Sequence, residues 1–301
     1  MPENHAPIQE EWTVGRLLTW TKGHLETKGI DEPRLAAELL LAHALGCKRI
    51  ELYTRYNQVA TAEQRAAFRE MVIAAAEHKP IAYLIGHREF YSLDFIVTPD
   101  VLIPRPETEL LVELALAWCQ EHPADRFTLL DIGTGSGCIA ITIAKRQPGI
   151  AAMATDISPA ALAVAARNGE RHGVADRVRF LEADLLSLPP DTVPPGGFDI
   201  IVSNPPYIAE RDREALPQNV RDYEPGQALL AGEDGLDIYR RLSPEAAPFL
   251  RPGGTLILEV GFDQADAVEN LFAASSPPLQ LLGRSKDLNG IDRAIQFTLP
   301  A

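Results

Sequence analysis

Residues 127–144 read FTLLDIGTGSGCIAITIA, a strand-like run followed by a glycine loop and an apolar helical run. Short apolar runs of this kind form buried strands, and the residues from Cys138 onward continue as a helix. Glycines let the backbone turn tightly and approach a ligand, while free N–H groups at the start of the helix face that ligand. The stretch therefore predicts one half of a nucleotide-type binding site. Its Gly-x-Gly-x-Gly spacing departs from the Gly-x-Gly-x-x-Gly pattern of dinucleotide sites, which disfavours NAD.

Two further strand-like runs end in acidic residues. The run 151–155 leads to Asp156, about twenty residues after the glycine loop, where a carboxylate can accept hydrogen bonds from ribose hydroxyls. The run 178–181 leads to Glu182 and Asp184. Each acid alone has an ordinary alternative as a solvated loop residue or a helix cap. Their equivalent positions at successive strand ends favour a shared site.

The most specific stretch for chemistry is Asn204-Pro205-Pro206-Tyr207, which directly follows the strand-like run 198–203. Two successive prolines fix φ and remove two N–H donors, so they form a stiff turn that holds its neighbours in place. The Asn204 side chain and the Pro205 carbonyl both offer acceptors, and Tyr207 offers a flat face beside them. Such a clamp suits a planar NH2 group. The alternative interpretation is an ordinary strand-to-loop turn.

From residue 127 onward strands and helices alternate, which predicts a parallel twisted sheet covered on both faces. A further strand is expected at 256–260, after a turn at 251–254. The first eighty residues instead show helical periodicity, over 12–28, from Asp31 to near Gly46, and after a capping box at 61–64. These residues predict a small helical bundle.

A strand-like pattern separates the two regions. We expect a hairpin with strands at 88–91 and 95–97 around a turn at 92–94. Pro106 then starts a helix, with Glu107 and Glu109 in its first turn, where carboxylates favour the helix dipole.

Composition sets limits on the function. The chain has 301 residues, of which 46% are hydrophobic, enough for a core domain and a smaller one. No run approaches the ~18 apolar residues that span a bilayer, and residues 1–5 lack the features of a signal peptide, so we expect a cytoplasmic protein without membrane contact.

The cysteines and histidines suggest no disulfide or metal site. Cys47, Cys119 and Cys138 are widely separated and are expected to be buried thiols, and the histidines show no metal-site spacing. The net charge of −14 argues against stable nucleic-acid binding, although a local basic patch can coexist with an acidic total. It leaves room for a basic protein partner.

Together these motifs resemble the class I S-adenosylmethionine-dependent methyltransferases, and more closely the bacterial PrmC/HemK family, which methylates a glutamine of peptide chain release factors. The resemblance covers essentially the whole chain. Besides the glycine loop and the Asn-Pro-Pro-Tyr clamp, it is carried by matches in order at 80–84, 90–91, 102–109, 224–229, 234–240 and 287–293. Many separated matches in order are more specific than any one of them.

The resemblance implies an α/β fold of the class I methyltransferase type. This fold is a twisted, mostly parallel Rossmann-like sheet, with the runs 279–282 and 294–299 as an antiparallel edge. A small N-terminal helical bundle and a β-hairpin connector precede it. We expect residues 1–78 to form a helical domain that docks the release factor, 79–105 to form the connector and 106–301 to form the methyltransferase domain. The chain is expected to act as a monomer.

The implied reaction is methylation, by S-adenosyl-L-methionine, of the side-chain amide nitrogen (N5) of the glutamine in the Gly-Gly-Gln motif of release factors. Asp156 would hold the ribose, Asp184 would accept from the adenine amino group and Leu185 would pack on the ring, where some relatives carry an aromatic residue. The expected catalytic residues are Asn204, Pro205, Pro206 and Tyr207, and the expected cofactor-binding residues are Gly133, Thr134, Gly135, Ser136, Gly137, Asp156, Asp184, Leu185 and Asn204. The role of Arg105 is open between substrate contact and structure.

Two other functions fit parts of the pattern. A nucleic-acid amino methyltransferase, acting on adenine N6, cytosine N4 or guanine N2, would use the same clamp with an aromatic residue against a flipped base. The acidic balance and the lack of an evident basic recognition domain disfavour it. A binding module without catalysis is disfavoured by the intact clamp.

Overall fold

The computed structural model describes residues 11–300, and the chain divides into two compact units, Met1–Gly86 and His87–Ala301. The division lies within the segment 79–105 that we predicted as a connector. Residues 1–5, which we expected to lack a signal peptide, lie outside the described residues. Among the described residues, no helix is long and apolar enough to cross a membrane.

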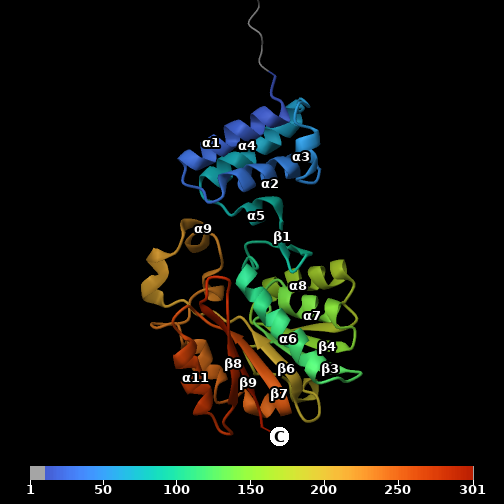
Figure 1. The fold of residues 1–301 in the computed structure, drawn as a ribbon, viewed down its shortest axis with the longest axis vertical. Coiled ribbons are helices and arrows are strands. Elements are labelled where there is room, and N and C mark those ends of the chain that lie inside the picture. Colours follow the sequence, from blue (N-terminus) through green and yellow to red (C-terminus); the bar gives the residue numbers. More distant parts are fainter. Residues whose placement is uncertain (1–10, 301) are drawn as a thin grey trace, which may run out of the picture. The chain divides into compact units, whose positions relative to one another are not determined.

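The first unit is a bundle of short helices (Figure 1). The predicted capping box is present, because Thr61 accepts a hydrogen bond from the Gln64 N–H while the Gln64 side chain accepts from the Thr61 N–H. The second helix ends at Gly46, whose φ of +61° is the left-handed conformation that ends many helices. The predicted helical bundle is therefore confirmed. Its helices are α1 (Val14–Thr27), α2 (Pro33–Leu45), α3 (Glu51–Thr54), α4 (Ala62–Ala76) and α5 (Ile81–Ile85).

The second unit contains a seven-stranded sheet with the order β5-β4-β3-β6-β7-β9-β8. The pairs from β5 to β7 are all parallel, and β9 runs antiparallel to both of its neighbours. The predicted mostly parallel sheet with an antiparallel edge is confirmed. The strands are β3 (Phe127–Ile132), β4 (Ile150–Asp156), β5 (Val178–Glu182), β6 (Phe198–Ser203), β7 (Leu250–Glu259), β8 (Gln280–Lys286) and β9 (Asp292–Thr298).

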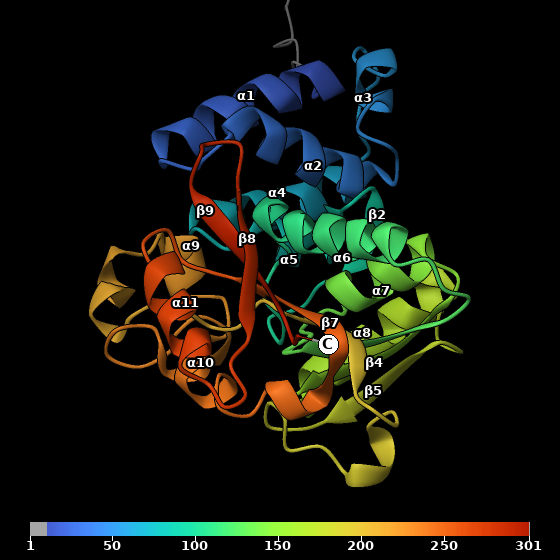
Figure 2. The ribbon, with the colours of Figure 1, turned by 60° about the horizontal axis from the view of Figure 1, so that its bottom comes forward.

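Helices cover both faces of this sheet because side chains alternate along each strand. In β3, Leu129 packs with the buried side chains of α6 (Glu109–Glu121) and α7 (Cys138–Arg146), and α8 (Pro159–His172) lies beside α7. Leu130 packs with buried side chains of α10 (Asp237–Leu242) and α11 (Ala265–Ala273). These two helices lie on the other side of the sheet from α6 and α7 (Figure 2). The remaining helical segments are α9 (Gln218–Arg221) and the 3-10 turns Pro106–Thr108, Pro190–Thr192, Glu210–Ala215, Gly226–Ala228 and Ala247–Phe249.

The predicted hairpin exists, but its turn was predicted wrongly. The strands are β1 (His87–Phe90) and β2 (Leu93–Ile96), joined by the two residues Tyr91 and Ser92 with φ of +52° and +61°. Such turns usually contain glycine or asparagine, so the sequence carried no signal for this one. Tertiary contacts hold it instead, since the Tyr91 N–H donates to Glu109 and its carbonyl accepts from Arg146.

The turn predicted at 251–254 is also corrected. Strand β7 begins at Leu250, and the pairing with β6 shifts register between Phe198 and Ile200. Gly253 has a φ of +75°, which suits an irregular strand as well as a turn. The Pro-Gly-Gly signal therefore marks a break in register inside one strand.

The strand order determines where the site lies. The chain runs from β3 outward through β4 and β5, then returns to the other side of β3 with β6. This reversal creates a crevice at the carboxyl ends of β3 and β6, the usual ligand position in such sheets. The glycine loop follows β3 and the clamp at 204–207 follows β6, so the topology makes the two predicted motifs neighbours.

Candidate active site

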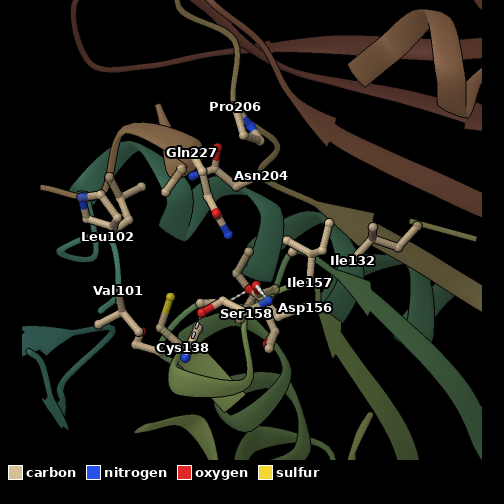
Figure 3. Close-up of a pocket in the computed structure, with 18 of the residues that line it drawn as sticks. Val101, Leu102, Ile132, Cys138, Asp156, Ile157, Ser158, Asn204, Pro206 and Gln227 are labelled. Atoms are coloured by element: carbon tan, nitrogen blue, oxygen red, sulfur yellow. Dashed lines mark hydrogen bonds between the residues drawn. The ribbon is translucent and has the colours of Figure 1, made fainter. Parts of the chain in front are cut away.

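A cavity of about 460 Å³ opens at the carboxyl ends of the parallel strands, a size typical of small-molecule sites. Figure 3 shows Asn204 and Gln227 on the opposite side of the cavity from Asp156 and Ser158. Of the residues predicted to bind the cofactor, those that line the cavity are Gly133, Thr134, Gly135, Ser136, Asp156, Asp184, Leu185 and Asn204.

Gly137 is the exception, and its role is packing. It has a φ of +82°, and a Cβ atom there would lie 2.6 Å from the Ile141 Cδ1 and 3.2 Å from the Ala165 Cβ. A Cβ atom at this position would therefore force the end of the Ile141 side chain in α7 to shift and would crowd Ala165 in α8. The predicted cofactor contact of Gly137 therefore stays a prediction, while its packing role follows directly from the geometry.

The glycine loop is held by a buried acid that sequence reasoning missed. Asp131, which is fully buried, accepts hydrogen bonds from the Thr134 hydroxyl at 2.6 Å and from the Ala140 N–H at 3.2 Å. Burial raises the pKa of Asp131 to about 7. The sequence did contain a signal for this role, because Asp131 is an acidic residue inside an otherwise apolar strand.

Asp156 holds the other side of the loop. One of its oxygens accepts from the Gly135 N–H and the other from the Ser158 N–H, both at 2.9 Å. Each carboxylate oxygen has a second lone pair for a further donor. Asp156 can therefore hold the loop and still accept hydrogen bonds from a ligand in the cavity.

Asp184 and Leu185 also line the cavity. The Asp184 carboxylate accepts from the Arg241 guanidinium at 2.8 Å, a partner that the sequence did not indicate. Leu185 has a φ of +52°, a conformation that costs a branched, bulky residue about 1–2 kcal/mol. Strained backbone of this kind concentrates at ligand sites.

The four clamp residues divide between two cavities. A second cavity, of about 180 Å³, is lined by Pro205 and Tyr207, and Pro206 lines the larger one. Asn204 lines both and so lies at their junction. The rest of the smaller cavity is mainly apolar, with Leu102, Ile208, Leu216, Pro217, Val220, Ala228 and Leu229.

Arg105 also lines both cavities, and it forms a structural ion pair as well. Its guanidinium donates to the carboxylate of Glu224, which is almost completely buried, at 2.5 Å. Glu224 also accepts from the Ile103 N–H at 3.1 Å. The pair therefore fixes the segment before α6 to the loop that follows the clamp, and places the remaining Arg105 surface beside Asn204.

A buried carboxylate lies behind the clamp. The Asn204 Nδ2 donates to the Thr108 hydroxyl oxygen at 3.0 Å, and the Thr108 hydroxyl donates to Glu259 at 2.7 Å. The Tyr207 hydroxyl donates to the other Glu259 oxygen at 3.3 Å. Burial raises the pKa of Tyr207, so the phenol keeps the proton that it donates.

Over residues 11–300, no group of three or more His, Cys, Asp or Glu side chains is placed to hold a metal ion.

Comparisons with known proteins show the family to which the chain belongs. The family model of the PrmC N-terminal domain matches residues 16–86, and that of the methyltransferase small domain matches 108–220. The release factor glutamine methyltransferase of Geobacter sulfurreducens is 44% identical over 286 residues, which cover 95% of this chain and 96% of the relative. The chain belongs to the release factor glutamine methyltransferase family. The family member of Rhodopirellula baltica is 46% identical over 289 residues, with 95% and 96% of the two chains covered.

A solved structure supports the fold separately. The catalytic domain of hMettl16, in complex with MAT2A 3′UTR hairpin 6, matches with a TM-score of 0.56 at 16% identity, over 78% of this chain and 82% of that chain. This identity is too low to carry function. Membership in the release factor glutamine methyltransferase family confirms the predicted family, the class I methyltransferase fold and the enzyme class.

Proposed function

We propose that this chain methylates the side-chain amide nitrogen (N5) of the glutamine in the Gly-Gly-Gln motif of peptide chain release factors, with S-adenosyl-L-methionine as the methyl donor. The observation that carries the proposal is the position of Asn204 at the junction of a larger cavity, lined by the glycine loop and Asp156, and a smaller one, lined by Pro205 and Tyr207. The names of its relatives support the same reaction. Release factors act at ribosomes, so the proposal implies a cytoplasmic enzyme.

The larger cavity fits the methyl donor. Its volume suits a nucleoside with an amino-acid tail, and the glycine loop lines it. We assign Asp156 to the ribose hydroxyls, Asp184 to the adenine amino group and Leu185 to the face of the ring. When bound, S-adenosyl-L-methionine supplies an electrophilic methyl group and a neutral leaving group.

The smaller cavity fits the glutamine. Apolar side chains such as Leu216 and Val220 suit the two methylene groups of a glutamine side chain, and Tyr207 offers a flat surface beside the amide. The Asn204 side-chain oxygen, at the junction, and the Pro205 carbonyl, beside the smaller cavity, would be two acceptors for the two amide hydrogens.

The clamp has a catalytic task because an amide nitrogen is a poor nucleophile. Its lone pair is delocalised into the carbonyl group. Two fixed acceptors align the nitrogen and stabilise the positive charge that develops on it in the transition state. The nitrogen becomes strongly acidic once it carries that charge, so no strong base needs to act in advance.

We also propose that the helical unit, with residues 1–78 as its main part, docks the release factor. This unit exposes large apolar side chains, including Trp20, Ile50 and Tyr56, at 52%, 69% and 48% of their surface. Exposed aromatic and aliphatic groups supply the area that protein interfaces bury. The net charge of −14 favours a basic partner by electrostatic steering.

Methyl transfer to separate substrates tests the proposal. The full chain is incubated with radiolabelled S-adenosyl-L-methionine and, separately, with purified release factors, with RNA and with DNA. We expect label in the release factor alone, and none in a release factor whose motif glutamine is replaced by glutamate. Label in nucleic acid instead would favour an exocyclic amino methyltransferase.

A further inference from the structure

The carboxylate of Glu259 lies behind the clamp without lining either cavity. Glu259 is the last residue of β7, and its side chain is almost fully buried, with 1% of the residue exposed. It accepts hydrogen bonds from two residues that come from different parts of the chain, Thr108 at 2.7 Å and Tyr207 at 3.3 Å. Thr108 in turn accepts from Asn204 at 3.0 Å. A single carboxylate therefore connects with both ends of the clamp.

While Glu259 is ionised, the hydrogen bonds that link it to Thr108 and Asn204 can run in only one direction. An ionised carboxylate accepts and cannot donate, so the Thr108 hydroxyl must direct its only hydrogen to Glu259. The Thr108 oxygen is then left as an acceptor, and Asn204 must present its NH2 group to it. The two ends of an asparagine amide are nearly equal in size, so hydrogen bonds decide which end points where.

We propose that Glu259 is a positioning residue that fixes the orientation of the Asn204 amide through Thr108, so that the Asn204 carbonyl oxygen is the end left to receive the substrate NH2 group. This inference rests on the proposed function of Asn204. Reversing the amide would turn a donor toward two amide hydrogens and remove the acceptor that the reaction needs. Glu259 thus acts on catalysis without touching the substrate.

The setting of Glu259 favours this role over a purely structural one. The titratable groups that face it are Glu107, Arg293, Tyr207, Tyr239 and Cys138. Arg293, the cation among these groups, pairs with Asp287 at 3.0 Å. Burial raises the pKa of Glu259 to about 7, so ionising this carboxyl costs free energy in the folded state. A neutral glutamine would fill the same space without that cost, but it would not enforce the direction.

The matched substitution Glu259→Gln tests the direction. A glutamine NH2 group can donate to Thr108, whose hydroxyl can then donate to the Asn204 oxygen and so reverse its amide. We expect kcat with a release factor to fall at least ~10-fold, toward the ~10²-fold loss of one preorganised contact. The Kd for S-adenosyl-L-methionine should stay within about twofold, and the melting temperature should not fall. In the unmodified chain, kcat should fall as the pH drops below about 7, because Glu259 becomes protonated. In Glu259→Gln this fall should be absent, because the group that titrates there is gone.

Substitutions at Thr108 provide a second route if Glu259→Gln fails to fold. Thr108→Ser keeps the hydroxyl and should keep kcat near the value of the unmodified chain. Thr108→Val removes the hydroxyl at nearly constant volume and should lower kcat at least ~10-fold on the same grounds. An unchanged kcat in folded Glu259→Gln, or equal kcat values in the serine and valine variants, would overturn the inference.

Measuring Asn204→Ala in parallel shows whether a failed test concerns only the role of Glu259 or also the proposed function. If Asn204→Ala loses activity while Glu259→Gln keeps it, only the role of Glu259 is wrong. If Asn204→Ala itself turns over normally, the proposed role of Asn204 fails, and the role of Glu259 fails with it.

Discussion

The side-chain nitrogen of Asn204 lies 3.0 Å from the hydroxyl oxygen of Thr108, although the two residues are 96 positions apart in the sequence. Thr108 ends the 3-10 turn Pro106–Thr108 just before α6, and Asn204 follows β6. The contact joins the start of the methyltransferase domain to the centre of its sheet. It holds the side chain of the loop residue Asn204 in place, as the role that we propose for it requires.

Removal of the Asn204 side chain should affect turnover more than cofactor binding. Asn204→Ala is expected to lower kcat by at least ~10²-fold, because its main contact with the substrate amide strengthens in the transition state. The Kd for S-adenosyl-L-methionine should change much less. Steady-state kinetics with a release factor, together with calorimetric titration of the cofactor, check both values. A folded variant with near-normal kcat would contradict the role assigned to Asn204.

Removal of the Asp156 side chain should weaken cofactor binding. Asp156→Ala is expected to cost ~1.5–3 kcal/mol of binding free energy, the range for hydrogen bonds to a charged group. Because Asp156 also holds the Gly135 N–H, the melting temperature should fall as well. Calorimetry and thermal melting measure the two effects. If a folded variant binds S-adenosyl-L-methionine with unchanged affinity, Asp156 holds the loop and does not bind the cofactor.

The backbone strain at Leu185 predicts an unusual order of stability. Leu185→Ala and Leu185→Gly both remove the packing of the side chain on the cavity wall. Only glycine adopts the φ of +52° without penalty, so the glycine variant should be more stable by ~1 kcal/mol. Chemical denaturation of both variants checks the order. An alanine variant at least as stable as the glycine variant would show that this position carries no strain.

The pKa values of two buried carboxyls are raised, so we expect the stability of the fold to depend on pH. The pKa of Asp131 rises from 3.8 to about 7, and that of Glu259 from 4.5 to about 7. Each group holds its proton more tightly in the folded chain. Its stabilising contribution is therefore complete below its unfolded pKa and is lost as the pH rises to about 7.

Glu259→Gln should consequently raise the melting temperature more at pH 8 than at pH 5. Thermal melting at the two pH values measures the difference. An equal effect at both values would mean that Glu259 does not change its ionisation in this range.

If the helical unit docks the release factor, loss of one contact there should raise the KM for the release factor and leave kcat nearly unchanged. Trp20→Ala should raise the KM for a release factor ~5-fold or more, the scale of an interface contact worth ~1 kcal/mol, with little change in kcat. Leu282→Ala is a matched control, since Leu282 is 53% exposed in the other unit, against 52% for Trp20. If both variants, or neither, show a raised KM, the interface does not lie at Trp20.

The sequence predicted the sheet, the helical bundle and the two motifs because these depend on local patterns. Apolar periodicity located the strands, and glycines and prolines located the loops between them. The parts that it did not predict depend on contacts over long separations. Thr108 and Glu259 are 151 positions apart, and Asp184 meets Arg241 across 57. No local pattern records such pairs, just as none marked the turn at Tyr91 and Ser92.

The most direct test of the account is to map the methyl group on a release factor by tandem mass spectrometry after incubation with the chain and S-adenosyl-L-methionine. We expect one methyl group, on the N5 atom of the glutamine in the Gly-Gly-Gln motif, and its near absence when Asn204→Ala replaces the unmodified chain. A methyl group at another residue, or equal modification by Asn204→Ala, would contradict it.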